Sequence, residues 1–303
     1  MSSFAILVVR GDLSVYGASP GTRIRSPYIR EADLYVSLKP ITAMNRVQLV
    51  PYIPATSWVG VMRNLLEKYY DLPANVPRIV RAKRIVAPIH ECETEEEKLR
   101  CPVCKLLARR DVVAWFDDIE PKGISFRVER KEAEVNFYNE KNELVARIYR
   151  KDEVTIPREK VEISETYRGA LNIAESPITA DVLKKAEWRL EPIPRAVELV
   201  SGVFTFGAKF LMSKLSVDDI RPFFIGLSLL EDYYVGRRGT RGYGRVKISN
   251  LRFTLRTSAY YEGEGDEIEI PIPDDAKTPK GVLKKWRELR EAIEEALRKS
   301  AGQ

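Results

Sequence analysis

Residues 195–212 read RAVELVSGVFTFGAKFLM, a run rich in valine and phenylalanine with three charged side chains. Because β-branched and aromatic residues favour strands, this run predicts a long strand at the centre of a sheet. The next segment, VDDIRPFFIGLSLLEDYYV (217–235), predicts a helix that begins near Asp218 or Asp219. It is followed by RVKISNLRFTL (245–255), which predicts another strand. Residues 195–255 therefore form a strand–helix–strand unit.

The part of the chain before residue 195 supplies further elements. PYIPATSWVGVMRNLLEKYY (51–70) predicts a helix after Pro54, capped by Thr56 or Ser57. Strands or strand hairpins are expected at residues 4–16, 34–44, 124–129 and 134–150. Without insertions, the order is strand, helix, strand, strand, helix, strand.

One short stretch, HECETEEEKLRCPVC (90–104), contains the single histidine and all three cysteines of the chain. His90, Cys92, Cys101 and Cys104 form the pattern H-x-C-x8-C-x2-C, which offers the four nitrogen and sulfur ligands of tetrahedral zinc. Four protein ligands leave no position for a reactive water, so the pattern predicts structural zinc. The alternative is one disulfide with a spare thiol, which a reducing compartment disfavours.

The order of the elements predicts an α+β fold with a ferredoxin-like (RRM-like) βαββαβ core, whose four-stranded antiparallel sheet is covered by helices on one face. Residues 1–260 would form this domain. A zinc-binding region at 75–122, otherwise made of loops, and a β-hairpin or thumb insertion at 130–192 would interrupt it. Residues 261–303 would form a C-terminal tail with an amphipathic helix.

The composition limits the compartment and the partners. The net charge of +6, from 50 basic and 44 acidic residues, does not by itself establish nucleic-acid binding. No apolar run is long enough to span a bilayer, and MSSFAILVVRGDLSVYG lacks a basic leader and a cleavage site. We expect a cytoplasmic protein without a membrane partner. A charged fraction of 31% is typical of proteins from high-temperature organisms.

The turn between the second core helix and the last strand reads GRRGTRGYGRVK (236–247), with four glycines, five cations and no acid. Glycine lets phosphate approach backbone amides, and arginine offers paired donors that match phosphate oxygens. The ring of Tyr243 offers a surface on which a base can stack. The segment predicts RNA binding, although DNA is not distinguished by these residues. The alternative is a simple glycine turn with solvated arginines.

Three motifs in this order resemble a known family. GRRGTRGYGRV resembles the glycine-rich signature of the RAMP superfamily of CRISPR-associated proteins, and PYIPATSWVGVMRNLLE resembles a segment of type III backbone subunits that usually reads PYIPGSSLKGxLR. CPVCKLLA resembles the end of a cysteine-containing insertion in some of these subunits. The resemblance implies an RNA-binding subunit that polymerises along a guide RNA, with a ferredoxin-like palm and a protruding hairpin. The hairpin at 134–150 is the candidate protrusion.

The resemblance also implies which residues contact the guide RNA. Free amides at the start of the first helix would face phosphate together with Trp58 and Gly60, whereas ordinary capping is the alternative there. A basic run at Arg78, Arg81, Lys83 and Arg84 would extend the groove or form a solvated surface. The expected contacts are Thr56, Ser57, Arg63, Gly236, Arg237, Arg238, Thr240, Arg241, Tyr243 and Arg245.

The chain departs from the family at the cleavage position. Target-cleaving subunits carry an aspartate in the loop before PYIP, whereas ITAMNRVQLVPYIP places Asn45 there. Because an amide replaces neither a carboxylate base nor a charged metal ligand, we expect no catalytic residue. Asp33 is the nearest upstream acid, and a shifted loop would bring it into play, although it is also explained as a solvated loop acid.

Three functions therefore compete. The first is a non-cleaving RNA scaffold of a type III interference complex against invading RNA or viruses, whose partners are guide RNA, target RNA, other effector subunits and copies of itself. The second is a target-cleaving or guide-processing endoribonuclease of the same superfamily. The third is a zinc-stabilised assembly protein whose C-terminal helix docks a partner and whose arginines are incidental.

Overall fold

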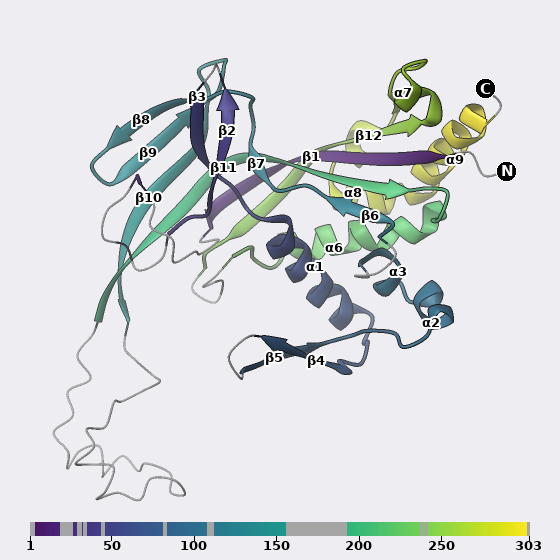
Figure 1. Cartoon of the computed structure of the whole chain (residues 1–303), viewed down its shortest axis with the longest axis horizontal. Coiled ribbons are helices and arrows are strands. Elements are labelled where there is room, and N and C mark those ends of the chain that lie inside the picture. Colours follow the sequence, from purple (N-terminus) through teal and green to yellow (C-terminus); the bar gives the residue numbers. More distant parts are fainter. Residues whose placement is uncertain are drawn as a thin grey trace, which may run out of the picture.

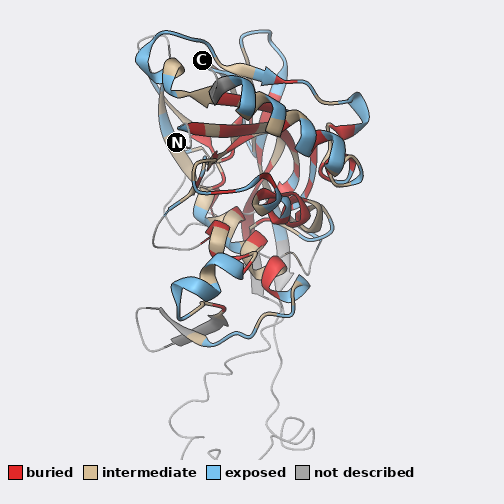
Figure 2. Ribbon diagram, turned by 90° about the vertical axis from the view of Figure 1, so that its right-hand side faces the viewer, coloured by how far each residue is buried: buried red, intermediate tan, exposed pale blue. Residues whose placement is uncertain are grey.

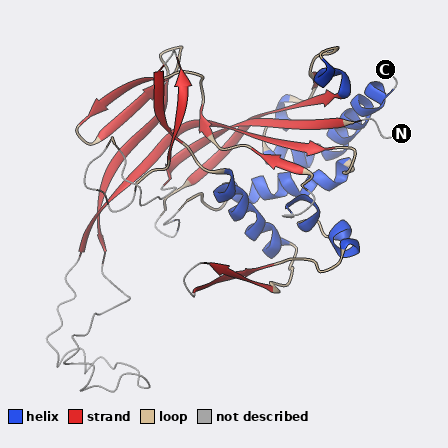
Figure 3. Cartoon of the chain, in the orientation of Figure 1, coloured by secondary structure: helices blue, strands red, loops and turns tan. Residues whose placement is uncertain are grey.

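The structure is a computed structural model that describes residues 4–18, 27–28, 32, 35–43, 46–80, 84–107, 112–155, 193–236, 239 and 242–301. In this part of the chain, nine strands form one antiparallel sheet (Figures 1 and 3). Its path runs β13-β12-β1-β11-β10-β9-β8, and β6 and β7 also pair with β11. These strands are β1 (Ala5–Ala18), β6 (Ala114–Phe116), β7 (Glu120–Pro121), β8 (Arg127–Lys131), β9 (Glu134–Tyr138), β10 (Leu144–Thr155), β11 (Ile193–Leu211), β12 (Arg245–Thr257) and β13 (Ile268–Ile270).

Strand β11 lies at the centre of this sheet, as predicted for residues 195–212. Strand β11 pairs with β1 along residues 200–211, with β10 along residues 193–202, and with β6 and β7 beyond that. Gly202 has φ of +150°, and a Cβ there would stand 2.1 Å from the carbonyl oxygen of Val145. The close approach of β10 and β11 at this point therefore requires glycine. The mixed architecture with an antiparallel sheet is confirmed.

Helices pack on one face of the sheet. The ring of Trp58 on α1 (Ala55–Tyr69) lies 5.9 Å from that of Phe206 on β11, and Phe224 on α6 (Arg221–Glu231) lies 5.6 Å from Phe253 on β12. Buried residues follow this contact between helices and sheet in Figure 2. The same layer includes the turn η1 (Val217–Ile220), so the helix expected at 217–235 begins as a tighter turn and ends at Glu231.

The C-terminal segment packs on the same core. It contains α7 (Ser258–Glu262), η3 (Asp274–Ala276), α8 (Pro279–Lys284) and α9 (Trp286–Ala301). Val282, Leu289 and Ile293 are fully buried, and the indole of Trp286 donates a hydrogen bond to Asp218. Because this apolar stripe is already covered by the chain itself, it does not offer a free docking face.

The strands expected at 4–16, 195–212 and 245–255 are confirmed as β1, β11 and β12, whereas those expected at 34–44 and 124–129 differ in part from the structure. The hairpin at 134–150 is confirmed as β9 and β10, with a turn in which the Asn142 amide donates to Asn139. Residues 38–51 form a separate hairpin of β2 (Leu38–Ala43) and β3 (Arg46–Pro51), not a strand of the main sheet. The strand expected at 124–129 begins at Arg127 and lies at the outer edge of the sheet.

The expectation that residues 75–122 hold only the metal region and loops is wrong. This segment forms the hairpin of β4 (Val76–Val80) and β5 (Arg84–Ile89), the helices α2 (Glu95–Arg100) and α3 (Cys104–Leu107), and the strands β6 and β7. β6 and β7 are too short to give a clear alternation, so only their pairing with β11 identifies them. Of the insertion expected at 130–192, residues 156–192 lie outside the described residues.

Candidate metal centre and nucleic-acid interface

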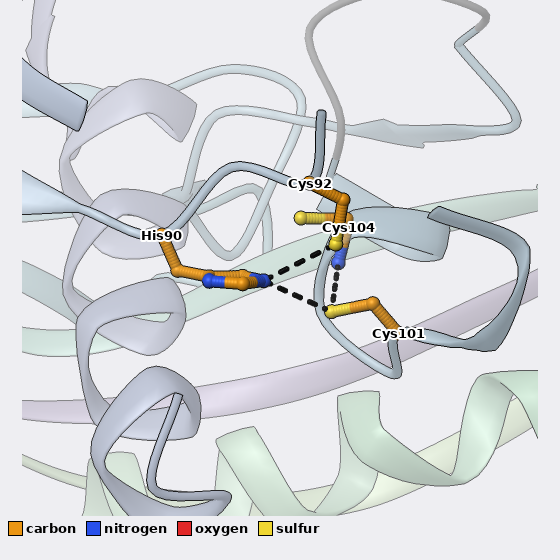
Figure 4. A group of neighbouring side chains, drawn as sticks. All are labelled: His90, Cys92, Cys101 and Cys104. Carbon is orange, nitrogen blue, oxygen red and sulfur yellow. Dashed lines mark hydrogen bonds between the residues drawn. The ribbon is translucent and has the colours of Figure 1, made fainter. Parts of the chain in front are cut away.

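His90, Cys92, Cys101 and Cys104 meet at one point beside α3 (Figure 4). Their four ligand atoms all lie within 4.8 Å of one another. The His90 Nε2 atom is 3.3 Å from Sγ of Cys92 and 3.5 Å from Sγ of Cys101. A tetrahedron with metal–sulfur bonds of about 2.3 Å places its ligand atoms about 3.8 Å apart, so this cluster could hold a metal ion.

Local structure brings the four ligands together. His90 directly follows β5, and α2 begins with a capping box in which Thr94 and Glu97 satisfy each other's backbone amides. The chain then turns through Pro102, so that the Cys104 amide donates to Sγ of Cys101 over 3.4 Å. The spacing H-x-C-x8-C-x2-C therefore encloses one short helix and one tight turn.

Hydrogen bonds set the protonation of the four side chains. The Nδ1 atom of His90 lies 2.9 Å from the carbonyl oxygen of Pro73, so it must carry the ring proton and leave Nε2 as the ligand atom. A hydrogen bond with Cys104 holds the pKa of the Cys101 thiol well below its usual range and raises the pKa of Cys104. All three cysteines are free thiols, so the disulfide alternative is not realised.

Arg63, expected to contact RNA, is instead tied to the metal region. Its side chain is 13% exposed, and its guanidinium donates to the carboxylate of Glu67 and to the carbonyl oxygens of Leu107 and His90. One mostly covered cation thus joins α1 to both ends of the segment that carries the cluster. The i,i+4 pairing of Arg63 with Glu67 on an otherwise apolar helix face was the sequence signal that could have revealed this.

The described residues at the two ends of the glycine-rich segment are hydrogen-bonded to each other. The Val235 amide donates to the carbonyl oxygen of Gly244 over 2.8 Å, and Gly244 in turn donates to Tyr16. Gly244 has φ of +77°, and a Cβ there would stand 2.1 Å from the Val235 carbonyl oxygen. Gly239 packs so tightly on the ring of Tyr234 that no side chain fits. Glycine at these positions is therefore needed for the loop itself.

Cations at the base of this loop point to solvent. Arg245 and Lys247 are exposed on β12, and neither has a hydrogen bond or an ion pair with any residue that the structure describes. The ring of Tyr243 is half-buried, with the ammonium of Lys151 4.9 Å from its centre. Gly236, with φ of +94°, begins the loop. Arg237, Arg238, Thr240 and Arg241 lie outside the described residues.

The start of α1 differs from the expected phosphate-facing turn. The helix begins at Ala55 after Pro54, so Thr56 and Ser57 lie inside its first turn and neither caps it. The Ala55 amide donates to Oδ1 of Asp118 over 2.8 Å, so a carboxylate already occupies the position that an anion would take there. Gly60 is exposed, whereas Trp58 is buried in the core.

The other candidate site residues add nothing to the site as the structure describes it. Asp33, Asn45, Arg81 and Lys83 lie outside the described residues. Arg78 and Arg84 belong to the hairpin of β4 and β5. No helix in the described ranges is long and apolar enough to cross a membrane.

Comparison with known proteins connects this geometry to one family. The model of a family described as the RAMP superfamily matches residues 40–247. The CRISPR system Cms endoribonuclease Csm3 of Mycobacterium tuberculosis is 26% identical over 259 residues, which is 83% of this chain and 89% of that relative. The protein of the same name in Methanothermobacter thermautotrophicus is 40% identical over 76 residues, 24% of this chain. The match covers only 31% of the length of that Methanothermobacter relative. It covers 29% of the length of the protein of the same name in Methanocaldococcus jannaschii.

Two solved CRISPR structures are among the matches to this chain. One is a chain of the Csm3–Csm4 subcomplex in the type III-A CRISPR-Cas interference complex, with a TM-score of 0.43 and 17% sequence identity. The match covers 95% of this chain and 98% of that chain. The other is a chain of the type III-B Cmr-beta complex bound to cognate target RNA, with a TM-score of 0.44 and 14% sequence identity. The match covers 82% of this chain and 60% of that chain.

Proposed function

This chain belongs to the RAMP superfamily, and from that membership we propose that it is a non-cleaving, guide-RNA-binding subunit of a type III CRISPR interference complex. The observation that carries the proposal is the outward-facing base of the glycine-rich loop, where Arg245 and Lys247 lack protein partners in the described part of the chain. Cations with free donors attract a phosphate backbone. Arg237, Arg238, Thr240 and Arg241 would continue this surface, with Gly236 and Tyr243 at its edges.

The topology supports a ferredoxin-like palm. The pairing β12-β1-β11, extended by β6 and β7 on the far edge of β11, is the strand order of a βαββαβ unit with α1 and α6 as its helices. In this proposal, residues 1–260 form the palm with insertions at 75–122 and 130–192, and residues 261–303 form the tail. The partners would be guide RNA, target RNA, other effector subunits and copies of this chain.

Zinc is the metal proposed for the cluster of His90, Cys92, Cys101 and Cys104. Three sulfur atoms and one imidazole nitrogen are the donor set that zinc prefers. With four protein ligands, the ion would stabilise the fold without reacting with substrate. The single histidine would be occupied by the metal, which argues against a guide-processing reaction that depends on histidine as acid or base.

The second candidate is target cleavage, because the three curated relatives are named endoribonucleases. Asn45 in place of the expected aspartate supports a non-cleaving role. The assembled complex would be incubated with labelled target RNA, comparing the unmodified subunit with Asn45→Asp and Asp33→Ala. We expect no cleavage by the unmodified subunit; cleavage that disappears in Asp33→Ala would replace the proposal with the second candidate.

RNA binding provides the main test. We expect Arg245→Glu/Lys247→Glu to weaken binding of single-stranded RNA roughly a hundredfold and to reduce the slope of log affinity against log salt by about 1.4, because two phosphate contacts are lost. Filter binding across a salt series measures both quantities.

The matched control is Lys284→Glu/Arg287→Glu, which reverses two exposed charges on α8 and α9. It should bind RNA with nearly the affinity and slope of the unmodified protein. Equal losses in the two double variants would mean that only net charge matters, and the third candidate, an assembly protein with incidental arginines, would be favoured.

A further inference from the structure

The sheet has a second face, opposite to the helices, that contains a hollow of about 630 Å³. Arg10, Gly207 and Arg252 lie directly opposite one another on β1, β11 and β12, so their side chains share one face of the sheet. Their sequence neighbours Phe206 and Phe253 point to the helices, and side chains alternate along a strand. The row of Arg10, Gly207 and Arg252 therefore faces away from α1 and α6.

One wall of this hollow is cationic. Arg252 is exposed and has no hydrogen bond or ion pair within the residues that the structure describes. Beside it, Arg10 is 41% exposed and held by Glu267, whose two carboxylate oxygens accept from the guanidinium over 3.1 and 3.2 Å. Arg256 also binds Glu267. Arg10 is thus oriented in advance, and its remaining donors together with all those of Arg252 are available to an anion.

The other wall consists of carboxylates. Asp117 accepts from Lys209 over 2.9 Å, and Glu120 pairs with Lys39. Asp117 has its own lysine, whereas Glu120 shares Lys39 with Asp118, which also lines the hollow. The carboxylates of Asp117 and Glu120 keep lone pairs that accept from further N–H donors, including the neutral amino groups of a ligand.

Gly207 separates the two walls. It is the residue in the row between Arg10 and Asp117, and a Cβ there would stand 2.3 Å from Oδ2 of Asp117. Any larger residue would push the carboxylate aside and fill the middle of the hollow. The hydroxyl-bearing Thr205 also lines the hollow, whereas the ring of Phe116 packs on Trp58 and Phe223 on the helix side. The volume lies within the range of sites for small molecules.

We propose that this hollow binds one nucleotide, with its phosphate on Arg10 and Arg252 and a base that bears an exocyclic amino group against Asp117 and Glu120. The nucleotide is either a free nucleoside monophosphate or one unit of a single-stranded RNA. Guanidinium groups bind phosphate through paired donors, and carboxylates accept from the amino groups of bases. This site lies on the open face of the sheet, is separate from the glycine-rich loop, and does not depend on the function proposed above.

Isothermal titration of the full chain with AMP, CMP and UMP tests the free-nucleotide arm, and fluorescence anisotropy with labelled hexanucleotides of A and of U tests the strand arm. We expect the amino-bearing ligands to bind about tenfold more tightly than the uridine ligands. Arg252→Ala should weaken binding of the amino-bearing ligand about tenfold, because a charge-assisted contact to phosphate is lost. Glu120→Gln should reduce the preference over uridine.

The matched control is Arg287→Ala, which removes another exposed arginine, on α9, and should leave all these affinities unchanged. AMP binding that depends on Arg252 identifies a site for free nucleotides, whereas the same dependence seen with A hexanucleotides alone identifies a unit of a strand. The proposal is overturned if neither ligand class binds saturably, or if Arg252→Ala binds both as tightly as Arg287→Ala does. RNA binding that is lost only in Arg245→Glu/Lys247→Glu would refute this site and leave the scaffold proposal standing.

Discussion

Cys101→Ser is expected to lower the free energy of unfolding by on the order of 5 kcal/mol and the melting temperature by about 10 °C. Cys101 is buried at the centre of the cluster, where its sulfur lies 3.5 Å from Nε2 of His90 and accepts from the Cys104 amide. A serine hydroxyl is a poor zinc ligand and leaves three ligands for the ion. Thermal unfolding followed by circular dichroism, with zinc content by elemental analysis, measures the effect.

A chelator supplies the control for this prediction. It should destabilise the unmodified protein by a similar amount and have little further effect on Cys101→Ser, because both changes remove the same ion. RNA affinity at the glycine-rich loop, measured below the melting transition, should be nearly unchanged. An unmodified protein that is folded, contains no metal and is indifferent to the chelator would refute the zinc proposal.

Arg63→Ala is expected to lower the free energy of unfolding by about 3–5 kcal/mol, although Arg63 contacts no RNA in the proposed scheme. The substitution leaves the carboxylate of Glu67, a residue only 6% exposed, without its cation. It also removes the donor from the carbonyl oxygens of His90 and Leu107. Chemical denaturation monitored by tryptophan fluorescence measures the loss.

The chain offers a matched pair for comparison. Arg287 and Glu291 have the same i,i+4 spacing on α9, but Arg287 is 92% exposed. Because water screens that pair, Arg287→Ala should cost no more than about 0.5 kcal/mol. The double variant Arg63→Met/Glu67→Met should be less destabilised than Arg63→Ala, since no unpaired charge remains buried. Equal effects of Arg63→Ala and Arg287→Ala would show that burial of the Arg63 pair contributes nothing.

The sequence determined the features that depend on neighbouring residues. The four residues of the His/Cys cluster lie within fifteen residues, and a short helix and a turn suffice to bring them together. The hairpin of β9 and β10 and the long strand β11 follow from turn chemistry and β-propensity, which are also local. The glycines at 239 and 244 indicated positions where the backbone needs a residue without a side chain. The close contacts at both positions agree with that prediction.

Only the tertiary structure decided which strands pair and which charges are left free. Arg63 appeared to be a surface cation in the sequence, and the packing of α1 on the metal region makes it a mostly covered link between the two. The hollow on the open face joins residues 10, 117, 207 and 252, which are brought together by the register of four strands. The physical reason is that period and propensity act over a few residues, whereas strand order and charge compensation depend on contacts between segments far apart in the chain.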